Sequence, residues 1–274
     1  MDAVDGIREM SKWPIDAVEF VADLPSSLPQ DIDRASREEM RGIVTESGKL
    51  LTVHAPFKGQ DITSPFPRRA RRSLGNLEAA IDLASDIGAI GVVVHPGRGR
   101  IMPGPFLVGR VGFYDRLVGF LHSEVPPRPD NIERNMRIIG RLLERSGVIE
   151  LYLENLPRMY NRRRFFEVVL GDNDALRICF DYGHSLISDW GWLLEDHFDR
   201  LGYVHFHLNS GQSDDHMPID PRDAGAREFL GFLATRGYGG IVMIEPTIND
   251  LEGARDSIDA TRSMLEEVSG KMGA

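Results

Sequence analysis

The chain has 274 residues, 42% of them hydrophobic, which is enough for a large buried core and a length typical of one α/β barrel. Its formal net charge of −10 argues against binding nucleic acid nonspecifically through a wholly basic surface, but it does not exclude a local basic patch. The single cysteine, Cys179, excludes an internal disulfide and lies in an apolar run, so we expect a buried thiol and not a nucleophile. No apolar stretch approaches the about 20 residues of a membrane span, and residues 1–25 lack a signal-peptide layout, so we expect a cytoplasmic protein.

Short apolar segments alternate with amphipathic helical patterns along the whole chain. Segments such as GVVVH and RICFD are apolar until their last residue, which is typical of strands in a parallel sheet that is covered on both faces. The predicted strands are Asp16–Phe20, Leu50–His54, Gly91–His95, Glu150–Glu154, Arg177–Asp181, Tyr203–His207 and Gly240–Glu245. The predicted helices cover residues 3–13, 74–87 with a stop at Gly88, 130–143 with a capping box of Asp130 and Glu133, and 251–265. The alternation predicts an α/β fold, a TIM-type (β/α) barrel, as a single domain over residues 1–274.

Two irregularities modify this prediction. Seven strands are visible where a TIM barrel has eight, and the chain begins at the helix that normally follows a first strand. The barrel is therefore either open at one seam, or a partner or a rearrangement fills the seam. The second irregularity is the segment 98–129, which is rich in Gly and Pro and carries aromatic residues. Its length predicts a lid or a subunit interface.

Polar residues lie where the strands end. Six of the seven strands finish in His, Asp or Glu, and two short loops add further ligand-type side chains. The carboxyl ends of parallel barrel strands meet at one mouth, where such enzymes place their chemistry. Nine candidates therefore converge there: His54, His95, Glu154, Asp181, His184, His205, Asp214, His216 and Glu245, with His207 as an alternative to His205.

The chemistry of this set indicates bound metal. One histidine at a strand end is more often a hydrogen-bonded structural residue than a ligand, but six strands repeat the pattern. Four carboxylates at close range would repel one another and resist ionising together unless cations neutralise them. Mixed His and carboxylate ligands favour zinc, manganese or iron over calcium and magnesium. We expect two or three divalent metal ions, zinc or manganese above all.

The same residues carry a family resemblance. The motifs are HAPF at His54, HPG at His95, LEN at Leu153, DYGH at Asp181, the stretch HFHLNSGQSDDHMPI and IEP at Ile244. In this order they resemble the xylose isomerase-like TIM-barrel superfamily, which contains sugar and sugar-phosphate isomerases and epimerases as well as abasic-site nucleases of the endonuclease IV type. The resemblance runs from about residue 3 to the C-terminus and lacks the usual first strand.

The resemblance implies two alternative ligand patterns. The nuclease pattern places one metal on His54, His95 and Glu154, a second on Glu154, Asp181, His205 and Glu245, and a third on His184, Asp214 and His216. The epimerase pattern needs only Glu154, Asp181, His205 and Glu245 around one metal, with the two glutamates as acid and base on opposite faces of a sugar carbon. His207 shares a strand face with His205, so either is the ligand and the other contacts substrate or supports the ligands. Glu154, Glu245 and His207 are the candidate catalytic residues.

Candidate substrate-binding residues complete the prediction. Arginine clusters around Arg68 and Arg162 follow the His54 and Glu154 strands, and guanidinium groups suit phosphate or carboxylate, although a solvated helix face explains them equally well. The HAPF and LEN motifs add Phe57 and Asn155. We therefore expect a small anionic sugar-like substrate, no membrane partner, and a possible homo-oligomer.

Three functions remain in competition. The preferred one is a metal-dependent isomerase or epimerase of a sugar, sugar phosphate or related polyol. The runner-up is an abasic-site nuclease, which the full ligand set favours but the acidic composition and the missing first strand oppose. The third is a metal-binding protein without catalysis.

Overall fold

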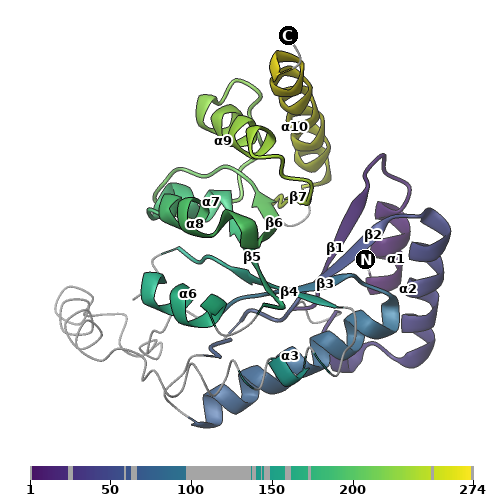
Figure 1. Ribbon diagram of the computed structural model, residues 1–274. Helices are drawn as coiled ribbons and strands as arrows, with labels where there is room; N and C mark the ends of the chain where they lie inside the picture. The colour runs from purple at the N-terminus through teal and green to yellow at the C-terminus, as the bar shows by residue number, and fades with distance from the viewer. Residues whose placement is uncertain are drawn as a thin grey trace, which may run out of the picture. The chain divides into compact units, whose positions relative to one another are not determined.

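In a computed structural model (Figure 1), the chain forms two compact units, Met1–Arg177 and Ile178–Ala274. The structure describes residues 2–23, 27–58, 60–62, 67–96, 137, 140–142, 144, 149–157, 162–171, 174–247 and 250–272, with the side chains of 162 and 269–272 left out. The predicted lid at 98–129 and the capping box of Asp130 and Glu133 lie outside these residues and stay predictions, as does the single-domain organisation.

The first unit is built on four parallel strands that neighbour one another in chain order. They are β1 (Ala17–Val21), β2 (Leu50–His54), β3 (Gly91–Val94) and β4 (Glu150–Glu154). Its helical elements are α1 (Ala3–Met10), the 3-10 helix η1 (Pro29–Asp31), α2 (Arg34–Ser47), α3 (Pro67–Ile87) and α6 (Arg162–Gly171). Helix α3 packs against β2 and β3, and α2 contacts both α1 and α3. Because the four strands are parallel, their carboxyl ends lie at the same edge of the unit.

Local signals explain where these helices begin and end. The Asp33 carboxylate accepts a hydrogen bond of 2.8 Å from the Ser36 amide and caps the start of α2. Gly48, with φ of 67°, ends α2, and Gly88, with φ of 77°, follows the last residue of α3. These left-handed conformations favour glycine. The stop predicted at Gly88 is confirmed.

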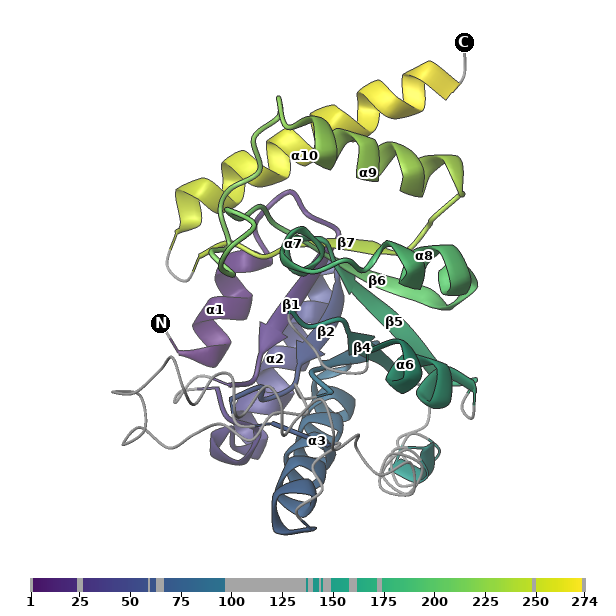
Figure 2. The same ribbon diagram turned by 90° about the vertical axis from the view of Figure 1, so that its left-hand side faces the viewer.

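The second unit holds β5 (Leu176–Asp181) from Ile178 onward, β6 (Leu201–Phe206) and β7 (Ile241–Ile244), again parallel and with β6 in the middle. Its helical elements are α7 (Tyr182–Ile187), α8 (Gly191–His197), the 3-10 helix η3 (Phe198–Arg200), α9 (Ala224–Thr235) and α10 (Leu251–Met272). Helices α9 and α10 lie side by side, as Figure 2 shows. The Asp223 carboxylate caps α9 by accepting from the Ala226 amide at 2.7 Å.

The described residues confirm all seven predicted strands, with the bounds of β2 and β4 as predicted. Among the described strands only β3 is buried along its whole length, as expected. Strands β2, β4, β5 and β6 are buried except for one or two residues, β1 alternates between buried and half-buried residues, and β7 is half-buried throughout. No helix in the described part of the chain is both long and apolar enough to cross a membrane.

Candidate metal centres

The first unit brings His54, His95 and Glu154 together at the carboxyl ends of β2, β3 and β4. Glu154 Oε2 lies 3.3 Å from His54 Nε2 and 3.0 Å from His95 Nε2. His54 and Glu154 are almost wholly buried, and His95 is partly exposed. Two ligands of one tetrahedral zinc ion lie about 3.3 Å apart when each bond is about 2.0 Å long, so these three atoms have the spacing of a common metal site.

The backbone decides which nitrogen of His54 faces the carboxylate. His54 Nδ1 lies 2.9 Å from the Ala55 carbonyl oxygen, which can only accept, so Nδ1 carries the hydrogen. In a neutral ring Nε2 then presents a lone pair to the Glu154 oxygen. Two buried acceptors facing each other require a proton or a cation between them. The three residues His54, His95 and Glu154 therefore fit a divalent metal ion.

The other predicted residues of this unit differ in what they contact. The Phe57 ring packs edge-on against His54 and tilted against His95, with centroid distances of 5.4 and 5.3 Å. Asn155 is fully buried directly after Glu154. Arg68 is exposed near the start of α3, and its side chain makes no hydrogen bond or ion pair with any residue that the structure describes. Arg162 begins α6, and its side chain is outside the described part.

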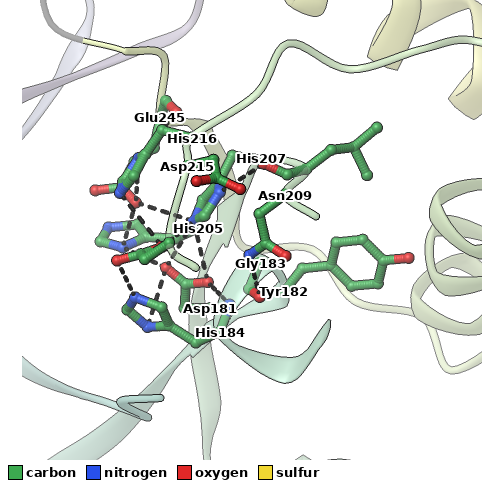
Figure 3. A network of polar contacts seen from close by, with 12 residues as sticks. Asp181, Tyr182, Gly183, His184, His205, His207, Asn209, Asp215, His216 and Glu245 are labelled. Atoms are coloured by element: carbon green, nitrogen blue, oxygen red, sulfur yellow. Dashed lines mark hydrogen bonds and ion pairs between the residues drawn. The ribbon is translucent and has the colours of Figure 1, made fainter. Parts of the chain in front are cut away.

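The second unit gathers its candidates around Asp181, the last residue of β5 (Figure 3). The fully buried Asp181 carboxylate caps α7 by accepting from the His184 amide at 2.6 Å. It also lies 3.4 Å from His184 Nδ1 and 3.3 Å from His207 Nε2. Ligand atoms of these three residues lie within 4.8 Å of one another, which makes them a second candidate metal site.

A third candidate site shares His207 and adds the loop after β6. Asp214 Oδ1 lies 3.8 Å from His207 Nε2 and 3.6 Å from His216 Nε2, and the two imidazole rings stack at 4.1 Å. Asp214 Oδ2 lies 3.1 Å from His184 Nε2. Burial opposes ionisation of both groups, yet the neighbouring histidines hold the pKa of Asp214 well below its usual range, and Asp214 and Glu245 raise the pKa of His216 to about 9. The residues thus attract positive charge to this position.

The tautomer argument applies here as well. His207 Nδ1 lies 3.3 Å from the Leu208 carbonyl oxygen, and His216 Nδ1 lies 3.3 Å from that of Glu245. Both Nε2 atoms then face carboxylates, as in the first unit. Together with His54, three histidines direct Nε2 at acidic groups by the same backbone device.

His205 and Glu245 form the remaining pair of the second unit. His205 Nδ1 lies 3.5 Å from Glu245 Oε2 and 3.8 Å from Asp181 Oδ2. His207 Nε2 lies 3.9 Å from the same Glu245 oxygen. Both histidines therefore reach the carboxylates that the family resemblance gives to one metal, and His207 also belongs to two clusters that the sequence reading did not include it in.

Sequence reasoning missed the residues that hold this arrangement open. A Cβ atom on Gly183, in helix α7, would lie 2.0 Å from His207 Cε1, so only glycine fits where the helix packs against this ring. The Gly183 carbonyl accepts a hydrogen bond of 2.7 Å from the Asn209 side chain. His216 has φ of 50°, a left-handed conformation that is uncommon outside glycine, and Thr247 donates to its carbonyl at 3.0 Å. The glycine inside DYGH was the available signal for the first of these.

Comparisons with known proteins identify the family and the fold of the chain. Residues 7–264 match the family described as xylose isomerase-like TIM barrel. An uncharacterized protein of Methanocaldococcus jannaschii is 25% identical over 300 residues, covering 97% of this chain and 95% of the relative. The crystal structure of a D-tagatose 3-epimerase-like protein superposes with a TM-score of 0.77 at 22% identity, over 99% and 96% of the two chains. Endonuclease IV from Thermus thermophilus superposes with a TM-score of 0.67 at 18% identity, over 97% and 94%.

Replacing Glu154 tests the candidate site of the first unit. Glu154→Gln should lose about one equivalent of bound zinc or manganese and keep its circular dichroism spectrum, because the substitution removes the charge of the ligand but keeps the size of the buried side chain. Metal analysis after dialysis is the measurement. Glu150→Gln is the matched control, since Glu150 begins the same strand with an exposed side chain. Equal metal content in both variants would contradict the assignment.

Replacing Gly183 tests the geometry of the second unit. Gly183→Ala should displace the His207 ring, weaken zinc binding and lower the free energy of unfolding by about 1–3 kcal/mol, the usual cost of overpacking. Gly42→Ala is the control, because nothing lies within 4 Å of a Cβ added there in helix α2. Thermal unfolding and zinc titration of both variants are the measurements. Wild-type zinc affinity in Gly183→Ala would refute this role of glycine.

Proposed function

We propose that this chain, which belongs to the xylose isomerase-like TIM-barrel family, is a divalent-metal-dependent isomerase or epimerase of a sugar, sugar phosphate or related polyol. The observation that carries the proposal is the repeated orientation of histidine Nε2 atoms toward carboxylates in both units. Such paired acceptors are stable when a cation lies between them. The family contains enzymes that use such cations on carbonyl substrates.

The chemistry follows from the two glutamates at strand ends. In the family's epimerase pattern Glu154 and Glu245 exchange a proton with the carbon next to a carbonyl. A divalent ion, when bound, would supply Lewis-acid stabilisation of the oxygens that gain negative charge. Glu154 is buried at the end of β4, where its carboxylate is shielded from bulk water. We propose His207 as a metal ligand beside Asp181, because its Nε2 faces that carboxylate at 3.3 Å.

The substrate is proposed to be sugar-like, with Phe57 and Asn155 near the reacting groups. Phe57 contacts both imidazole rings of the first unit, so it has a position from which an apolar sugar face could be contacted. Among the described residues the Arg68 side chain contacts neither cluster, and the Arg162 side chain lies outside the described part, so an anionic group on the substrate stays a prediction from the sequence.

A second candidate, an abasic-site phosphoester hydrolase, is favoured by one observation. The cluster of His184, His207, Asp214 and His216 in the second unit exceeds what a single-metal epimerase requires. Three metal ions suit the charge of a phosphate. A metal-binding protein without catalysis is the third candidate, and turnover of any sugar substrate would eliminate it.

Isotope exchange tests the preferred function. Protein loaded with zinc or manganese, incubated in deuterated water with a panel of ketoses, aldoses and their phosphates, should incorporate deuterium at the carbon next to the carbonyl of one of them. Glu245→Gln should abolish the incorporation, because one of the two proton carriers is lost. Mass spectrometry or proton NMR of the sugar is the measurement. Glu252→Gln is the control, since Glu252 lies exposed in the first turn of α10.

The same variants separate the second candidate. A hydrolase should nick duplex DNA that contains an abasic site and leave all sugars without deuterium. His184→Ala should then lower the cleavage rate by about 100-fold or more, as expected when a metal that stabilises the transferred phosphate is lost. Gel analysis of the nicked strand is the measurement. Cleavage at an ordinary enzymatic rate without isotope exchange would overturn the isomerase proposal.

A further inference from the structure

A buried carboxylate and an exposed ammonium group lie beside the first candidate metal site and take no part in it. Asp23 follows the end of β1, and Lys58 follows the end of β2. The Asp23 side chain is only 5% exposed, while that of Lys58 is 65% exposed. Lys58 Nζ lies 3.6 Å from Asp23 Oδ2, and within the described residues this oxygen has no hydrogen-bond partner.

The pair is electrically balanced but incomplete in hydrogen bonds. A distance of 3.6 Å exceeds the range of an N–H···O hydrogen bond, so the ammonium group neutralises the carboxylate without donating to it. A buried charged oxygen that lacks a donor carries the full cost of its lost hydration. An additional donor is therefore what this oxygen requires, and the open side of the pair is the lysine, because its side chain is exposed.

Contacts connect the pair to the candidate metal site. Lys58 Nζ lies 5.7 Å from the centroid of the Phe57 ring, and Phe57 packs against both His54 and His95. A turn that is closed by the Gln60 amide and the Phe57 carbonyl, at 3.1 Å, holds this segment after β2. Asp23 and Lys58 thus lie at the same edge of the unit as the His54, His95 and Glu154 cluster.

We propose that Asp23 and Lys58 bind one hydroxyl group in a neutral part of the substrate. A hydroxyl donates its hydrogen to the Asp23 oxygen and accepts from the Lys58 ammonium, so it completes both groups at once. An anionic group would be repelled by Asp23, and a cationic group by Lys58. The inference rests on the proposed sugar-like substrate, because it assigns one hydroxyl group of that substrate to the pair.

The test uses the metal-loaded full chain and neutral sugars as probes. Binding of D-fructose and of its monodeoxy forms is measured by calorimetry on wild type, Asp23→Asn and Lys58→Met. Wild type should bind one deoxy form about 10-fold more weakly than D-fructose, the effect of one hydrogen bond to a charged group. Both variants should bind D-fructose about 10-fold more weakly than wild type does, and should no longer distinguish it from that deoxy form.

Controls and outcomes separate this inference from the proposed function. Lys12→Met is the matched control, because the Lys12 side chain is also 65% exposed and pairs with Glu9 in α1. Metal content and thermal unfolding confirm that each variant is folded. Unchanged D-fructose binding in Asp23→Asn, or no binding of the panel to wild type, would overturn the inference. Binding that depends on Asp23 without deuterium exchange would overturn the isomerase proposal alone, whereas exchange with binding independent of Asp23 would overturn this inference alone.

Discussion

The hydrogen bond from a histidine Nδ1 to a backbone carbonyl is the interaction on which the candidate sites depend. At His54 the acceptor is the carbonyl of the next residue, at a distance of 2.9 Å, and His207 repeats the relation with Leu208 at 3.3 Å. Because a carbonyl only accepts, the ring presents Nε2 as the atom that faces the carboxylates. The backbone carbonyl thus determines the tautomer of the histidine, and the end of the strand positions its ring. Without this device the same residues would form ordinary hydrogen-bonded pairs.

In the second unit, a helix cap, a close-packed glycine and a left-handed residue position the candidate ligands. Asp181 serves two purposes, since one carboxylate caps helix α7 and faces His207 and His184. Close packing at Gly183 allows the His207 ring to approach the Asp181 carboxylate. The left-handed backbone at His216 allows the loop after β6 to stack the His216 ring on the His207 ring. Backbone conformations of this kind persist where the surrounding structure stabilises them, and they concentrate at functional sites.

The sequence predicted the strands and their polar ends because both follow from short-range rules. An apolar run that ends in His, Asp or Glu identifies β2 and β4 to the residue, and parallel topology then gathers the ends. Contacts between distant residues were not predictable in this way. The proximity of Gly183 to His207 depends on how β5 and β6 align, which no local pattern encodes. Asp23 was missed because it follows the predicted end of its strand, where a single acidic residue is an ordinary loop residue.

The number of occupied sites decides which chemistry the second unit can support. Asp181, Asp214 and Glu245 contribute three carboxylates, and a histidine in contact with them, such as His207 through Nε2, is neutral when it binds metal through one ring nitrogen. One divalent ion leaves a net negative charge, so a carboxylate keeps the basicity that proton abstraction requires. Two divalent ions reverse the sign and create a positive site, which stabilises a phosphate but suppresses a glutamate base. Under the two proposed functions, occupancy by one ion fits the isomerase and occupancy by two ions fits the phosphoester hydrolase, so metal stoichiometry discriminates between the proposals more directly than any single side chain does.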